Sequence, residues 1–182
     1  MKKTRGKNPT WSDLKGRLAA LDRPALLGLI QDLYAASRDN QAFLHARFAL
    51  GEDVLAPYKA TIHRWVCPDV IRNQNCSVTK AKGAISDYRK AVGAPEGLAE
   101  LTVFYCESCM ELLACCGMED EGYFGALARV FGQSLDAIAQ LEPDRRTAFV
   151  ERLDRVRREG RKWGGAGDDM NDLMKAHGFP KG

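Results

Sequence analysis

The stretch that decides the fold is Leu98–Met118, LAELTVFYCESCMELLACCGM, which is the longest apolar run of the chain. It contains four of the six cysteines, and Gly117 stands where a helix would end. Glu100, Glu107 and Glu111 interrupt the run, so it falls short of the about 18 uninterrupted apolar residues that a membrane span needs. The segments on both sides have helical periodicity, which predicts that this stretch is the central helix of a helical protein.

Helix start and stop signals divide the rest of the chain, and no segment alternates apolar and polar residues over the length of a strand. The sequence therefore predicts an all-α fold, an irregular antiparallel array of about eight or nine helices. A short solenoid-like stack of helix pairs is the alternative arrangement. The expected helix starts are Thr10 or Ser12, Asp22, Ser77 or Thr79, and Asp120, with Pro95 and Pro143 in the first turns of two further helices.

A length of 182 residues suits one domain, and we predict a flexible basic tail over 1–9 followed by a single helical domain over 10–182. The segment 67–78 has no period and is expected to be a loop. The second helix is expected to bury one face, made of Leu26, Leu29, Ile30, Leu33 and Tyr34.

The net charge is only +3, but the charges are grouped in blocks of alternating sign. Residues 1–7 contain four cations, and residues 54–90 contain seven cations against two acids. Residues 96–136 contain eight acids against one cation, and 144–162 are again basic. Such blocks either pair across helices inside one fold or present a basic face to an acidic partner, and the first is the usual case.

Segments spread over most of the chain have a family resemblance: SVTKAKGAISDYRKAVGAPEGLAELTVFYCESC, EDEGYFGALARVF and RKWGGAGDDMNDLM, with a Leu14, Leu18, Leu21, Asp22, Leu26 opening. The chain is similar to a family of small all-helical bacterial proteins of unknown function, most clearly over residues 77–131 and at the Trp163-Gly164 turn. The resemblance implies an all-helical fold and supplies no catalytic residues. The cysteines depart from the apolar residues that the family usually has at those positions.

The cysteines have three possible roles: metal binding, core packing and redox sensing. At 100° per residue, Cys106, Cys109 and Cys116 share an arc of about 80° on one helix, and His63 and Cys67 lie four residues apart on the preceding segment. However, the Cys-x-x-Cys pair lies inside a helix and there is no second pair to complete a metal knuckle. We therefore favour a cysteine-rich core in which the thiols are buried as small apolar groups, and redox sensing is the remaining alternative. The candidate metal ligands are Cys106, Cys109, Cys116, His63, Cys67 and Cys76.

Basic residues with interleaved aromatics form a second candidate site, for nucleic acid. Trp65 and Tyr88 lie among the cations of the middle segment, and such a pattern can follow a phosphate backbone. A solvated helix face explains the pattern equally well, because Asp87 lies among these cations and no helix-turn-helix or zinc finger is present. The candidate nucleic-acid-binding residues are Lys2, Lys3, Arg5, Lys7, Arg64, Lys80, Lys82, Arg89 and Lys90.

The sequence contains no nucleophile elbow, P-loop, HExxH or paired-carboxylate motif, so it predicts no catalytic residue and no cofactor, and it argues against an enzyme. The basic N-terminus has no apolar segment behind it, so we expect a cytoplasmic protein with reduced thiols and no membrane contact. The predicted function is a non-catalytic helical scaffold or protein-interaction module, whose partner is another protein or a second copy. The alternatives are a nucleic-acid-associated accessory protein and a thiol or zinc sensor.

Overall fold

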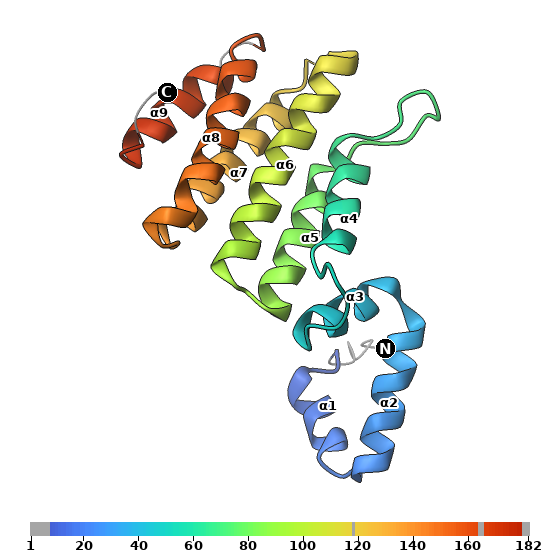
Figure 1. The fold of residues 1–182 in the computed structure, drawn as a ribbon. Coiled ribbons are helices and arrows are strands. Elements are labelled where there is room, and N and C mark those ends of the chain that lie inside the picture. The colour runs from blue at the N-terminus through green and yellow to red at the C-terminus, as the bar shows by residue number, and fades with distance from the viewer. Residues whose placement is uncertain (1–7, 118, 164–165, 180–182) are drawn as a thin grey trace, which may run out of the picture. The chain divides into compact units, whose positions relative to one another are not determined.

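The computed structural model describes residues 8–117, 119–163 and 166–179, and all of the regular structure in those ranges is helical (Figure 1). This confirms the predicted all-α fold and the expected number of helices. The helices are α1 (Trp11–Leu18), α2 (Arg23–Ala36), α3 (Arg38–Arg47), α4 (Ala56–Val66), α5 (Val78–Ala91), α6 (Pro95–Cys116), α7 (Glu121–Ala139), α8 (Pro143–Gly160) and α9 (Ala166–Ala176).

The helices begin where local sequence signals predict. The side-chain oxygens of Asp22, Ser77 and Asp120 accept hydrogen bonds from backbone N–H groups in the first turns of α2, α5 and α7. Thr10 forms a capping box, in which its backbone N–H donates to the Asp13 carboxylate at 2.8 Å. These side chains satisfy N–H groups that a helix leaves without partners, which is why the starts can be recognised from sequence.

Contacts along the chain divide it into two compact units, Met1–Gln41 and Ala42–Gly182, with the boundary inside α3. The single domain predicted for 10–182 stays a prediction, because two compact units can still unfold together as one cooperative domain. Residues 1–7, which include most of the predicted flexible tail, lie outside the described residues.

The first unit contains α1, α2 and the start of α3. The Asn40 side-chain amide donates to the carbonyl oxygen of Leu33 at 2.6 Å, and the Gln41 amide donates to that of Tyr34 at 3.1 Å, so α3 satisfies carbonyls in the last turn of α2. Neither α1 nor α2 contains a buried residue. The predicted buried face of α2 is therefore wrong: Leu26 is half-buried, and Leu29, Ile30, Leu33 and Tyr34 are exposed. The eight residues of α1 offer too little surface to cover the apolar side of α2.

The second unit is built around α6, as the sequence predicts. Helix α6 contacts α4, α5, α7 and α8, and its side chains Tyr105, Leu112 and Leu113 are among the largest that are fully buried. Each consecutive pair, α4 with α5, α6 with α7 and α8 with α9, packs together, and α4, α6 and α8 also contact one another in order. Figure 1 shows this succession of helices from α4 and α5 to α9. No described helix has the length and apolar character to cross a membrane.

Ion pairs link the outer helices to α6. The Arg152 guanidinium on α8 donates to the Glu107 carboxylate at 2.8 and 2.6 Å and to Glu100 at 2.5 Å, and Lys59 on α4 lies 2.7 Å from the Glu100 carboxylate. These pairs join the acidic block of 96–136 to cations before and after it. The charge blocks of the sequence therefore pair, at least here, across helices of one fold.

Candidate functional site

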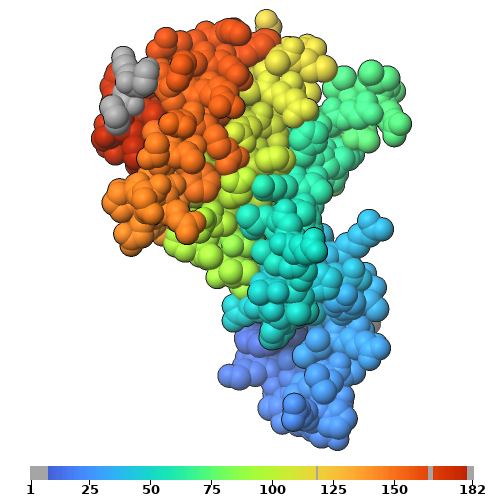
Figure 2. All heavy atoms as spheres, viewed as in Figure 1, coloured from blue at the N-terminus to red at the C-terminus, as the bar shows by residue number. Residues whose placement is uncertain are grey.

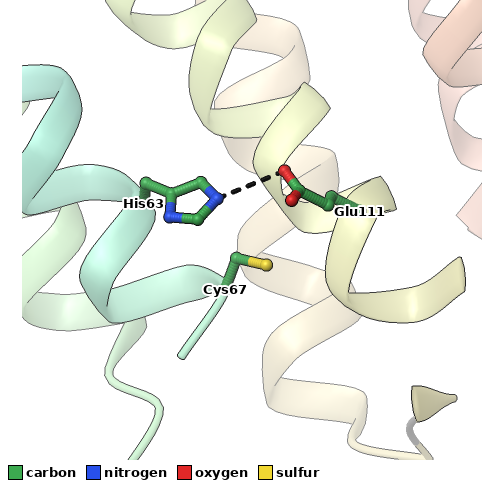
Figure 3. Close-up of side chains that lie close together, drawn as sticks. All are labelled: His63, Cys67 and Glu111. Carbon is green, nitrogen blue, oxygen red and sulfur yellow. Dashed lines mark hydrogen bonds and ion pairs between the residues drawn. The ribbon is translucent and has the colours of Figure 1, made fainter. Parts of the chain in front are cut away.

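The most chemically distinctive group of side chains lies between the C-terminal ends of α4 and α6. His63 lies in the last turn of α4, and Cys67 is the residue that caps its C-terminus, with its N–H donating to the His63 carbonyl at 2.8 Å. The spacing of four residues places both side chains on one side of the helix. Glu111 on α6 faces them, with its Oε2 3.2 Å from His63 Nε2 (Figure 3). One possible ligand atom from each residue lies within 4.8 Å of the other two.

This His63–Cys67–Glu111 cluster opens onto a pocket of about 500 Å³, which both His63 and Cys67 line. The pocket also has an apolar wall, because the Phe104 ring lies 6.5 Å from the His63 ring between centroids. The side chains of His63 and Glu111 are 42% and 64% exposed, so an ion or small molecule can reach them from solvent. The remaining pocket residues are Lys59, Ala60, Arg64, Asp69 and Gln74.

The Cys67 thiol sits among groups that disfavour its ionisation. Burial raises the pKa of Cys67 to about 11, and electrostatic repulsion from the Glu111 carboxylate, and from the thiolate forms of Cys115, Cys116 and Cys76, adds to the rise. The thiol is therefore protonated at neutral pH when no cation is near. Because a nucleophilic or redox-active cysteine needs a lowered thiol pKa, this cluster does not favour the redox interpretation.

The structure divides the other predicted metal ligands among different places. Cys106 and Cys109 are fully buried beneath α7, with Cys106 Sγ 4.0 Å from Ser134 Oγ. Burial raises the pKa of Cys106 to about 12 and that of Cys109 well above its usual value. Cys116, in the last turn of α6, and Cys76, in the loop before α5, are both exposed. The shared arc on α6 thus holds two core thiols and one surface thiol.

His63 and Cys67 are among the ligands predicted from the sequence, but Glu111 is not. Glu111 lies 48 residues after His63, and no spacing rule connects them. Only the packing of α4 against α6 brings the carboxylate to the imidazole. Helical spacing could identify His63 and Cys67 as a pair on α4, because four residues make about one turn. It could not identify the third group, which lies on another helix.

The predicted nucleic-acid residues that the structure describes lie on more than one side of α5. The Arg64 guanidinium and the Lys80 ammonium lie over the Trp65 ring, 4.5 and 3.9 Å from its centroid. On α5, Lys80 and Arg89 are nine residues apart, which places them on opposite sides of the helix, about 180° apart. Lys90 pairs with Asp87 at 3.1 Å.

The other members of this predicted site differ in their availability. Lys82 and Arg89 share a side of α5, and among the described residues neither forms an ion pair with an acid. Tyr88 is buried against Tyr58, with ring centroids 5.5 Å apart, so it cannot stack on a base. Lys2, Lys3, Arg5 and Lys7 lie outside the described residues.

The first unit presents a different kind of candidate site, an apolar surface on α1, α2 and the turn between them. Leu27 and Leu33 are 57% and 51% exposed, and the other large apolar side chains here are more than a third exposed. The five members on α2 fall within an arc of roughly 160° at 100° per residue, so one side of the helix is apolar. We call this the N-terminal apolar surface, and its members are Trp11, Leu14, Leu21, Leu27, Leu29, Ile30, Leu33 and Tyr34.

Comparison with known proteins identifies no relative of this chain. No family model matches it, and neither a curated protein nor a solved structure is significantly similar to it. The resemblance to a family of small helical bacterial proteins therefore stays a prediction, and any function has to be argued from the geometry of the chain itself.

Proposed function

We propose that this protein is a non-catalytic helical interaction protein that self-associates through the N-terminal apolar surface. The observation that carries the proposal is the absence of any buried residue in α1 and α2, although α2 has six large apolar side chains among its fourteen residues. In the second unit the comparable apolar side chains are covered: α7 buries Tyr123, Leu127, Phe131, Leu135 and Ile138. A helix whose apolar side lacks a cover in its own unit needs a cover from elsewhere.

The size of the surface is right for a protein partner. Large apolar side chains at these exposed fractions present on the order of 700 Å² together, close to the roughly 800 Å² that each partner buries in a standard interface. An apolar patch of a few hundred Å² is already at the upper end of what monomeric proteins expose. Burial of apolar area is the main favourable term in protein association, so this surface is the strongest docking feature of the described chain.

The charges around the surface favour a second copy as the partner. Helices α1 and α2 and their connection contain three acids and three bases, so two copies meet here without net repulsion. A two-fold dimer places the same patch on both sides, so the apolar side of α2 in one copy would pack against the same side in the other. The six charged residues are Asp13, Lys15, Arg17, Asp22, Arg23 and Asp32.

The test is sedimentation equilibrium of the full chain at roughly 1 to 100 µM, with the double variant Leu27→Glu/Leu33→Glu beside the wild type. We expect a wild-type dimer with a dissociation constant on the order of micromolar, and about 100-fold weaker association for the variant, because two interface positions become charged. The matched control is Ile71→Glu, the same kind of change at a residue of the 67–77 loop that is 91% exposed. That loop projects as the green lobe in Figure 2.

The outcomes separate self-association from misfolding and from binding through charge. The control is expected to dimerise like the wild type, and far-ultraviolet circular dichroism has to show equal helix content in all three proteins. A wild type that stays monomeric at 100 µM would overturn the proposal, as would a dimer that the double variant does not weaken. Association should persist in 0.5 M salt, whereas binding through the predicted cations to nucleic acid would weaken steeply.

A further inference from the structure

We propose that His63, Cys67 and Glu111 form a binding site for one divalent transition-metal ion of the zinc class, with the remaining coordination position open to the adjoining pocket. The site lies in the second unit and is independent of the N-terminal apolar surface. It differs from the ligand set that the cysteine pattern suggests, because it replaces Cys76, Cys106, Cys109 and Cys116 with a carboxylate on α6.

The distances between the donor atoms suit such an ion. Metal–ligand bonds of about 2.0–2.3 Å at tetrahedral angles place neighbouring donors roughly 3.3–3.7 Å apart. His63 Nε2 and Glu111 Oε2 are 3.2 Å apart, and the greatest separation within the cluster is below 4.8 Å. Closing the remaining distance of about 1 Å requires rotamer changes, which the solvent-accessible side chains of His63 and Glu111 can make without disturbing the core.

The chemistry of the donors selects the class of metal. One imidazole nitrogen, one sulfur and one carboxylate oxygen match the ligands of zinc, whereas Mg²⁺ and Ca²⁺ take oxygen ligands alone. Three protein ligands with one open position are typical of zinc sites that bind water or a small molecule. The pocket beside His63 and Cys67 provides the room for that fourth ligand.

The charges around the cluster also favour a cation. The Glu111 carboxylate supplies a negative charge at the cluster, and its ion-pair partner among the described residues is His63, another of the proposed ligands. The two cations that line the pocket are engaged elsewhere: Lys59 lies 2.7 Å from Glu100, and Arg64 lies over Trp65. Lys59 is therefore paired with an acid outside the cluster.

The experiment uses the full chain, purified with a chelator and kept reduced, and titrated with Zn²⁺ against a chromophoric competitor. We expect one equivalent bound with micromolar or tighter affinity, and an unfolding temperature that rises with the Zn²⁺ concentration. Titration with Co²⁺ should produce a charge-transfer band from a single thiolate. Each of the variants His63→Gln, Cys67→Ser and Glu111→Gln should weaken binding at least about tenfold, which is the minimum loss seen when even outer-shell partners of a metal are removed.

Matched controls separate this site from general binding by histidines and thiols. His177 forms a comparable pair with Asp136 at 3.0 Å but is not part of a three-residue ligand cluster among the described residues, so His177→Gln should leave the affinity within about twofold. Cys76→Ser and Cys116→Ser should have equally small effects. Glu111→Gln is the decisive variant, because this residue is exposed and its change should preserve the fold. Zinc affinity that Glu111→Gln leaves unchanged, or that Cys76→Ser or Cys116→Ser abolishes, would overturn the proposal.

Discussion

Gly97→Ala tests the closest approach between two helices of the second unit. Gly97 lies in the first turn of α6, opposite Tyr88 of α5. A Cβ atom at this position would lie 2.0 Å from the Tyr88 hydroxyl oxygen and 2.4 Å from Cζ, far inside van der Waals contact. The Tyr88 ring cannot easily retreat, because it is buried and packs edge-on against Tyr58 at 5.5 Å. Either the ring or the start of α6 has to shift.

The sign of the effect follows from two opposing magnitudes. Replacing a helical glycine by alanine gains up to about 1 kcal/mol, because the unfolded chain loses conformational freedom. Overpacking a close contact costs about 1–3 kcal/mol, and an overlap of more than about 1 Å falls at the upper end. We expect the free energy of unfolding to fall by about 2 kcal/mol, which for a chain of this size lowers the unfolding temperature by about 4–8 °C.

The assay is urea unfolding followed by circular dichroism, with Gly125→Ala as the control. Gly125 lies inside α7, and apart from the backbone of its own helix no atom lies within 4 Å of a Cβ added there, so the same change should raise the free energy of unfolding by about 0.5–1 kcal/mol. Adding Tyr88→Phe to Gly97→Ala should recover part of the loss, since it removes the nearest atom but leaves the ring. Equal stability of Gly97→Ala and wild type would refute the reasoning.

Two further predictions concern charged groups of the second unit. Arg157→Ala should lower the free energy of unfolding by about 2–3 kcal/mol in a urea titration, because it removes the buried partner of the Asp154 carboxylate and leaves only Arg158 paired with it; a loss below about 1 kcal/mol would contradict this. Burial alone would raise the pKa of Glu100, but hydrogen bonds from Arg152 and Lys59 outweigh it and lower that pKa. Its stabilising contribution is therefore fully present above its unfolded pKa of about 4.5 and is lost as the pH falls through the folded pKa. Glu100→Gln should cost roughly 1–2 kcal/mol at neutral pH and nothing in strong acid, and a difference that does not vary with pH would refute this assignment.

Local sequence signals determined most of the secondary structure. Asp22, Ser77 and Asp120 cap their helices as predicted, because a cap is a hydrogen bond between a side chain and a backbone group three residues away. The 67–78 segment, which lacks any period, contains no helix before Val78. The apolar run at 98–118 became the central helix α6, since a helix that is apolar on most sides has to be enclosed by others.

Tertiary packing decided the properties on which both proposals depend. Periodicity marked one side of α2 as apolar but could not say whether anything covers it, and in the first unit nothing buries Leu27 or Leu33. The predicted arc of cysteines on α6 follows from helical spacing, but it does not determine which thiols are buried: Cys106 is covered by α7, whereas Cys116 is exposed. Glu111 meets His63 only because α4 packs against α6. The physical reason is that caps and helical periods are set within a few residues, whereas burial and side-chain encounters depend on which helices pack together.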